Sequence, residues 1–278
     1  SQYRGPTWIG PEPPPAARRL GPADWARICL RGVPTVIVLF GGLAVLLAIR
    51  AIEAPLAGRR RPVTGRIPRL AFASVCRIIG LRRTVRGRPL EGIGAAVANH
   101  VSWLDIFALN AADRVLFVAK AEVARWPGIG WLARGAGTLF FRRDRAEAAG
   151  QAAQLVERMA LGQRPLVFPE GTSSDGLRVL RFKPTLFAAF FEPALRDVVQ
   201  AQPVTVLYDA PPGADARVYA WWGDLDFAPH LLQVLALPRQ GRVTVIYHPP
   251  RRVAEFADRK ALAAACEADV RAGLDATD

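Results

Sequence analysis

An uninterrupted apolar run near the N-terminus dominates the pattern of hydrophobic and polar positions. It reads GVPTVIVLFGGLAVLLAI from Gly32 to Ile49, carries no charge, and is bounded by Arg31 and Arg50. A helix of this length extends about 27 Å, slightly less than the roughly 30 Å core of a bilayer. The run lies too far from the N-terminus, and lacks a convincing cleavage site, for a removable signal peptide. It predicts a helix that spans the bilayer or dips into one leaflet, with a buried core helix as the less favoured alternative.

The next segment mixes apolar residues with arginine. Residues 50–88 contain eleven arginines and one acid, Glu53. Within them, RIPRLAFASVCRIIGLRR (66–83) has apolar residues at helical spacing between the arginines, which predicts a second helix lying at a membrane interface. Basic segments beside membrane helices favour the cytoplasmic side, so the bulk of the chain is expected there. Four arginines between residues 18 and 31, on the other flank, weaken that expectation.

Beyond residue 90, short apolar runs alternate with helical patterns. The runs that predict strands buried on both faces are 93–99, 114–120, 137–143, 164–170, 203–209 and 242–248. Helices are expected at 102–111, 145–161, 183–196, 229–236 and 255–273. This alternation predicts an α/β fold, with a mostly parallel central sheet flanked by helices and preceded by a membrane-embedded helical segment. The predicted organisation is a flexible, proline- and glycine-rich segment at 1–25, membrane-anchoring helices at 26–88 and an α/β domain at 89–278.

Composition narrows the choice of partners. The 278 residues are 51% hydrophobic and carry a formal net charge of +13. Such an excess of positive charge favours anionic partners, namely nucleic acid, phosphorylated substrates or an anionic lipid surface. The three cysteines are scattered without a C-x-x-C spacing, so neither a zinc site nor a disulfide framework is supported and no metal is expected. A reduced, cytosolic setting for the α/β domain is the simplest interpretation.

The stretch NHVSWLD places His100 five residues before Asp105 in a chain with three histidines. On one continuous helix, side chains at this spacing diverge by about 140°. The two can meet only if His100 lies in a strand-to-helix turn and Asp105 in the first helical turns, with Ser102 as the cap of a helix starting at Trp103. Asp105 would then hold one ring nitrogen and leave the other free to take a proton. A structural histidine followed by a helix N-terminal carboxylate is an equally good interpretation of this spacing alone.

Two more predicted strands end in polar residues. GTLFFRR ends with Arg142 and Arg143, and FPEGTSSDG turns at Glu170, while a further strand, QPVTVLY, begins with a proline. In an α/β sheet, ligands bind beyond the carboxyl ends of the strands. We therefore expect one crevice to gather His100, Arg143 and Glu170.

These segments together resemble the motifs of the glycerolipid acyltransferases. NH-x4-D, G-x-x-F-F-x-R, FPEGT and the proline-led strand occur in that order within about residues 65–210. The best-known bacterial member of that family is 1-acylglycerol-3-phosphate acyltransferase. The resemblance implies a membrane-bound O-acyltransferase on the cytoplasmic side of a bacterial inner membrane. It would move an acyl chain from an acyl carrier protein or coenzyme A thioester to a lysolipid, with no other cofactor; the oligomeric state stays open.

Carried over residue by residue, the resemblance makes His100 the general base and Asp105 its orienter. The acceptor hydroxyl then attacks the thioester directly, without an acyl-enzyme. Arg143 matches the arginine that holds the acceptor's anionic head. The other substrate-binding positions are Glu170, Gly171, Thr172, Lys120 and Arg142. A backbone N–H near Gly171 is the expected oxyanion donor, and for Lys120 a solvated surface lysine is an equally good interpretation.

One position departs from the family pattern. The family commonly has arginine after FPEGT, where this chain has Ser173. A phosphate-binding cation is therefore absent, or is replaced by Arg142, Arg178 or Arg181. FPEGTSSDG and the later WWGDLDFAPHLLQVLALPR are more similar to the lyso-ornithine lipid acyltransferases, whose acceptor has an amino-acid head and no phosphate. The reaction type is unaffected, while the acceptor, lysophosphatidate or lyso-ornithine lipid, stays open.

Two other functions agree with parts of the sequence. A serine-type lipid esterase requires a nucleophile on a sharp turn, typically G-x-S-x-G, and the chain contains no such string. A non-enzymatic basic protein bound to membranes or nucleic acid would explain the arginines of 59–88. Phe72 is the only aromatic residue among them, which disfavours nucleic acid as a partner. His230 and His248 have no carboxylate at a comparable spacing and are expected to be structural.

Overall fold

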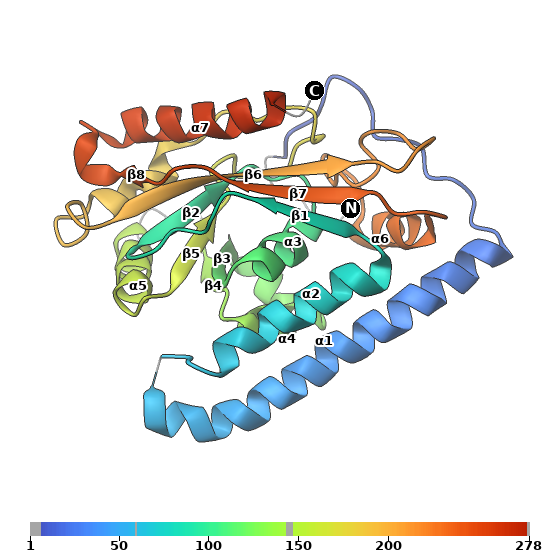
Figure 1. The fold of residues 1–278 in the computed structure, drawn as a ribbon, viewed down its shortest axis with the longest axis horizontal. Helices are drawn as coiled ribbons and strands as arrows, with labels where there is room; N and C mark the ends of the chain where they lie inside the picture. Colours follow the sequence, from blue (N-terminus) through green and yellow to red (C-terminus); the bar gives the residue numbers. More distant parts are fainter. Residues whose placement is uncertain (1–6, 59, 143–146, 277–278) are drawn as a thin grey trace.

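A central sheet organises the computed structural model, which describes residues 7–58, 60–142 and 147–276 (Figure 1). The strand order is β1-β7-β6-β2-β5-β3-β4, and β8 pairs with β6. The strands are β1 (Arg82–Arg86), β2 (Gly94–Ala98), β3 (Val115–Lys120), β4 (Leu139–Phe141), β5 (Arg164–Val167), β6 (Gln200–Asp209), β7 (Arg242–Tyr247) and β8 (Arg251–Arg252). Neighbours are parallel except where β6 pairs with β7 and β8, which confirms the prediction of a mostly parallel sheet.

Helices cover both faces of this sheet. They are α2 (Ile67–Ile79), α3 (Leu104–Ala112) and α6 (Phe227–Ala236) on one face, and α5 (Ala148–Ala160) and α7 (Arg259–Asp275) on the other. The central strand β2 is buried along its whole length. Ala96 and Ala98 pack with the first group of helices, whereas Ala95 and Val97 pack with the second. This two-sided burial explains why the strand sequences are continuously apolar rather than alternating.

The apolar N-terminal run belongs to a helix longer than predicted. α1 extends from Pro22 to Ala57 and packs along α2, α6 and α4 (Ile129–Ala136), so it lies beside the domain (Figure 1). It is long and apolar enough to cross a bilayer, and only 11% of its most apolar window is buried. Its outer face exposes Leu30, Val33, Val36, Ile37, Val45, Leu47, Ile52 and Leu56.

Several predicted elements differ in the structure. The helix predicted over 66–83 ends at Ile79, because Gly80 adopts a left-handed conformation (φ 83°), and the chain continues as the edge strand β1. The helix predicted over 183–196 is instead a 3₁₀ segment, η3 (Pro184–Phe191). Pro193 follows Glu192, whose extended backbone (ψ 136°) ends the helical turns. α4 was not predicted.

The segment before α1 has no helix or strand from residue 7 to 21, yet it makes specific contacts. The N–H of Trp8 donates to Oγ1 of Thr172 at 3.3 Å, and Arg217 pairs with Glu12 at 3.1 Å. The segment predicted to be flexible extended to residue 25, whereas α1 begins at Pro22. The contacts above tie described residues of the 7–21 segment to the domain. Trp8 joins a small apolar cluster that includes Trp222.

Candidate active site

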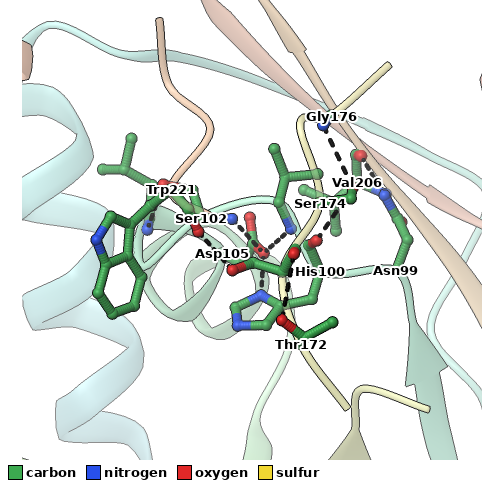
Figure 2. A network of polar contacts seen from close by, with 12 residues as sticks. Asn99, His100, Ser102, Asp105, Thr172, Ser174, Gly176, Val206 and Trp221 are labelled. Atoms are coloured by element: carbon green, nitrogen blue, oxygen red, sulfur yellow. Dashed lines mark hydrogen bonds and ion pairs between the residues drawn. The ribbon is translucent and has the colours of Figure 1, made fainter. Parts of the chain in front are cut away.

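His100 and Asp105 lie together beyond the carboxyl end of β2 (Figure 2). β2 ends at Ala98 and α3 begins at Leu104, so His100 occupies the turn between them. Nδ1 of His100 lies 2.7 Å from Oδ2 of Asp105. Oγ of Ser102 accepts the N–H of Leu104 at 3.3 Å, close to the capping role expected for it. The turn-then-helix arrangement that the spacing required is the one observed.

The Asp105 carboxylate is held on all sides. It is fully buried, and Oδ2 also accepts the N–H groups of Val101 at 2.8 Å and Ser102 at 3.0 Å. Oδ1 accepts the hydroxyl of Tyr208 on β6 at 2.8 Å. Burial, together with the charge of Asp105, keeps the pKa of Tyr208 well above its ordinary value, so this phenol stays a donor. The carboxylate therefore accepts from Nδ1–H of His100, so in the neutral ring the lone pair is on Nε2.

The ring of His100 is fixed on its flat side as well. It stacks on Phe168, with the ring centroids 4.1 Å apart and the planes 15° apart. Nε2 points away from Asp105 (Figure 2) and has no hydrogen-bond partner among the described residues, and 21% of the side chain is exposed. A ring with one anchored nitrogen and one open, unprotonated nitrogen is suited to act as a general base.

Glu170 follows β5 but does not face solvent. Its side chain is 2% exposed, and Oε1 accepts the N–H of Leu180 at 3.3 Å. Burial raises the pKa of Glu170 to about 9, and the charge of Asp105 adds to the effect, while backbone N–H groups of Leu180 and His100 act in the opposite direction. At neutral pH the group is therefore a carboxylic acid beneath the turn, in contact with the protein's own backbone.

The turn after Glu170 requires glycine. Gly171 has φ 70°, and a Cβ at this position would lie 2.6 Å from Nζ of Lys183. Its N–H donates to the carbonyl of Phe168 at 3.0 Å, so the amide expected to serve as an oxyanion donor is used inside the turn. Lys183 was missed by sequence analysis because nothing in the FPEGT motif indicates that η3 folds back over it. Its backbone N–H donates to Pro169 O at 2.9 Å, which holds it there.

The other basic residues expected in the site are more scattered. Arg142 is exposed and paired with Glu147 at 3.2 Å, and Arg143 lies outside the described residues. Lys120 ends β3, which is separated from β2 by β5. Arg178, one of the suggested replacements for a cation at Ser173, pairs with Asp175 at 3.0 Å and lies over the Trp8 ring. Within the described residues there is no group of three or more histidine, cysteine or acidic side chains that could hold a metal.

Comparison with known proteins identifies the family. The Acyltransferase family profile matches residues 83–207, which include both the histidine–aspartate pair and the FPEGT turn. The chain is 54% identical over 269 residues to the lyso-ornithine lipid O-acyltransferase of Rhodobacter capsulatus, covering 97% of each protein. The chain belongs to the glycerolipid acyltransferase family. It is an acyltransferase, as its motifs predicted.

This acyltransferase is also similar to a relative that acts on another acceptor by name and to a solved structure. It is 42% identical to the 1-acyl-sn-glycerol-3-phosphate acyltransferase of Neisseria gonorrhoeae over 106 residues, 36% of this chain and 41% of the relative. Its fold is similar to the crystal structure of the 1-acyl-sn-glycerophosphate acyltransferase PlsC from Thermotoga maritima. The TM-score is 0.63 at 19% identity, over 92% of this chain and 98% of that one, and this likeness confirms the predicted fold class.

Proposed function

We propose that this acyltransferase transfers a fatty acyl chain from an acyl thioester, carried by acyl carrier protein or coenzyme A, to the hydroxyl of lyso-ornithine lipid. Relatives named lyso-ornithine lipid O-acyltransferase support this acceptor, because one of them matches nearly the whole chain. Ser173 supports it too, since an acceptor without phosphate needs one cation fewer. Lysophosphatidate is the second candidate acceptor, supported by the Neisseria relative over the motif region.

The geometry of His100 carries the proposed mechanism. Nε2 takes the proton of the acceptor hydroxyl as the oxygen attacks the thioester carbonyl, forming the new C–O bond. Asp105, 2.7 Å from Nδ1, stabilises the imidazolium that results. When the tetrahedral intermediate collapses, the C–S bond breaks, and the thiolate leaves with the proton that His100 returns. No covalent enzyme intermediate is needed.

The developing oxyanion requires hydrogen-bond donors. We assign it to the backbone N–H groups of Thr172 and Ser173, because neither has a hydrogen-bond partner among the described residues. They lie on the same turn as Phe168, on which His100 stacks. Lys183, whose Nζ lies next to Gly171, would hold an anionic group of the acceptor at this turn. Lys120, Arg142 and Arg143 stay further binding positions that the family resemblance implies. Neutral Glu170 would support the turn from below.

The proposal also includes a membrane-bound enzyme at the cytoplasmic face of a bacterial inner membrane. α1 supports a helix lying within one leaflet, because it packs on the domain along its length and exposes apolar side chains such as Leu47 and Ile52 outward. A helix that crossed the bilayer would have to leave these contacts. An embedded α1 would also bring the lysolipid hydroxyl, which stays in the bilayer, to the domain.

Acyl transfer from labelled thioester to two acceptors tests the proposal. Membranes containing the protein are incubated with labelled acyl thioester and either lyso-ornithine lipid or lysophosphatidate, with the His100→Ala variant as control. We expect labelled ornithine lipid from the wild type and almost none from the variant. If labelled phosphatidate were the only product, the acceptor would be lysophosphatidate and not lyso-ornithine lipid. Product formation by the variant at the wild-type rate would contradict the assignment of His100.

A further inference from the structure

A second recess lies at the opposite end of the sheet from His100. It is lined by the guanidinium-bearing side chains of Arg61, Arg114 and Arg164 and by the amides of Asn110 and Gln163. Arg164 is the first residue of β5, and the recess also touches the start of β3. Both strands run parallel to β2, so the recess lies at their amino ends, whereas the catalytic pair follows the carboxyl end of β2.

Positive charge in this recess is only partly balanced, because Arg61 and Arg114 have no ion-pair partner among the described residues. Burial lowers the pKa of Arg61, and the guanidinium groups of Arg50, Arg158 and Arg114 lower it further, while Glu53 raises it. Burial likewise lowers the pKa of Arg114, as does Arg66, while Glu53 and Asp113 raise it. The described residues that line the recess include no carboxylate. Of the two acids nearby, Asp113 is bonded to Arg164, and Glu53 is bonded to Arg50 and to the Thr64 turn.

The lining arginines still have donors to offer. Each guanidinium has five N–H donors. Among the described residues, Arg61 uses one on the carbonyl of Gly135 at 2.8 Å, and Arg114 uses one on the carbonyl of Arg61. Nε of Arg164 is buried without any partner in the described structure. These contacts hold the side chains in place and leave N–H groups for an anion, whose binding would relieve the mutual repulsion.

An apolar crevice adjoins the recess and shares Pro68 and Ala136 with it. It is lined by side chains of α1, α2 and α4; α1 packs on both other helices and runs beside α2 in Figure 1. Its lining includes Leu39, Leu43, Leu46, Ala71, Phe72 and Leu132. A basic recess joined to an apolar crevice matches an amphiphile that has an anionic head and a hydrocarbon tail.

We propose that the recess and the crevice form a binding site for an anionic phospholipid, separate from the catalytic site. Its phosphate accepts hydrogen bonds from the guanidinium groups of Arg61 and Arg114, because a phosphate oxygen pair matches the planar guanidinium fork. Arg164 adds only its Nε–H, since its terminal nitrogens already donate to Asp113 and to the carbonyl of Leu90. One acyl chain lies in the crevice against the inward side of α1, where Leu39, Leu43 and Leu46 line it. The site would hold the enzyme on anionic membranes whichever acceptor it uses.

Lipid-dependent thermal stability of the full-length protein tests this site. The unfolding midpoint is measured in neutral detergent micelles containing phosphatidylglycerol, in micelles containing phosphatidylcholine, and with inorganic phosphate alone. We expect phosphatidylglycerol to raise the midpoint most, with half-saturation at least about tenfold higher in the Arg61→Gln/Arg114→Gln double variant. Ala71→Leu, which narrows the crevice, should weaken the lipid effect and leave any effect of phosphate unchanged.

Matched controls separate the site from general charge attraction. Arg242→Gln/Arg252→Gln removes the same charge at exposed positions of β7 and β8 and should bind like the wild type. His100→Ala should also bind like the wild type, so loss of acyl transfer and loss of this site are distinguishable. Equal midpoints in the two lipids, or equal weakening by both double variants, would overturn the proposal. If inorganic phosphate raised the unfolding midpoint as much as phosphatidylglycerol did, and Ala71→Leu left both effects intact, the site would bind a free anion and the lipid proposal would be wrong.

Discussion

His100 and His248 make contacts of the same length in different surroundings. Nδ1 of His100 lies 2.7 Å from a buried carboxylate, and Nε2 of His248 lies 2.7 Å from Oγ1 of Thr205. Thr205 gives its own hydrogen to the carbonyl of Val270 at 2.9 Å, so the His248 ring must be the donor to it. Burial under α7 lowers the pKa of His248. The charge of Asp269 acts on His248, but this carboxylate is already paired with Arg251 at 2.6 Å.

The difference shows that a short contact does not make a histidine a base. In His100, Nδ1 faces a carboxylate, Nε2 is open and the ring stacks on Phe168. In His248, Nε2 faces a neutral hydroxyl, that of Thr205, which in turn donates to the backbone carbonyl of Val270. His230 makes the same point, because it accepts from Nε1 of Trp103 at 3.0 Å and burial lowers its pKa to about 4. Substitutions at the two kinds of site should therefore have different consequences.

The largest expected effect is at His100 itself. His100→Ala removes the proposed base, and acyl transfer should fall by about 10³-fold, within the range for general-base catalysis. His248→Gln, which keeps a donor for Thr205, should retain activity within about threefold, since this network does not touch the reacting groups. Initial rates with saturating acceptor measure both. Comparable losses in the two variants would remove the distinction between the sites.

Asp105→Asn should cause the next largest loss of activity, after His100→Ala. The amide no longer stabilises the imidazolium and can donate to Nδ1, which leaves the proton on Nε2, the wrong nitrogen for a base. Because the change disables the proposed base, a loss of about 10²- to 10³-fold in kcat is expected, within the range for general-base catalysis. Circular dichroism should show an intact fold, because the side chain keeps its shape. A variant that folds normally and turns over at the wild-type rate would show that Asp105 does not orient His100.

Tyr208→Phe should lower kcat less than the substitutions of His100 and Asp105. The phenol donates to Oδ1 of Asp105 at 2.8 Å, so its loss frees one carboxylate oxygen without touching His100. We expect about a tenfold loss in kcat, with KM nearly unchanged, because a hydrogen bond to a charged group contributes about 1.5–3 kcal/mol. Tyr247→Phe is a suitable control, since that buried hydroxyl has no partner among the described residues. A change in KM alone would place Tyr208 in substrate binding.

Glu170→Gln should change stability more than activity. The native group keeps its proton up to about pH 9, whereas the ordinary value is 4.5, so between these values the folded state binds a proton that the unfolded state has lost. The free energy of unfolding of the wild type should therefore fall as pH rises, by up to about 1.4 kcal/mol per pH unit. Glutamine does not titrate, so its stability relative to the wild type should increase from pH 5 to pH 9.

Urea unfolding in detergent at several pH values, followed by tryptophan fluorescence, measures this difference. Activity of the Gln variant should stay within a few fold at pH 7, since the amide is neutral like the native acid. A stability difference that does not change with pH would mean that Glu170 is ionised in the folded protein.

Much of this protein was predictable from local sequence. All six strands predicted from apolar runs are present, because burial on both faces leaves a direct mark on composition. The spacing of His100 and Asp105 left a catalytic pair and a structural histidine equally good, and the ordered motifs favoured the pair; its contact across a strand-to-helix turn is observed. Boundaries were less predictable: a left-handed glycine ended α2 early, and Pro193 kept η3 from becoming an α-helix.

Other features depend on contacts between distant segments. Tyr208 follows Asp105 by 103 residues and reaches it only because β6 pairs with β2. Phe168 stacks on His100 because β5 pairs with β2 on the other side. No local pattern reports such neighbours, since strand order is set by the packing of the whole sheet.

The sequence by itself determined the mostly parallel α/β fold, the apolar helix and the candidate catalytic residues, because these follow from spacing, motifs and hydropathy along the chain. Only the tertiary structure decided that Glu170 is a buried acid, that α1 lies along the domain, and that arginines from separate segments line one recess. Charge state and ion binding depend on desolvation and on neighbouring charges in three dimensions, which a linear pattern does not contain.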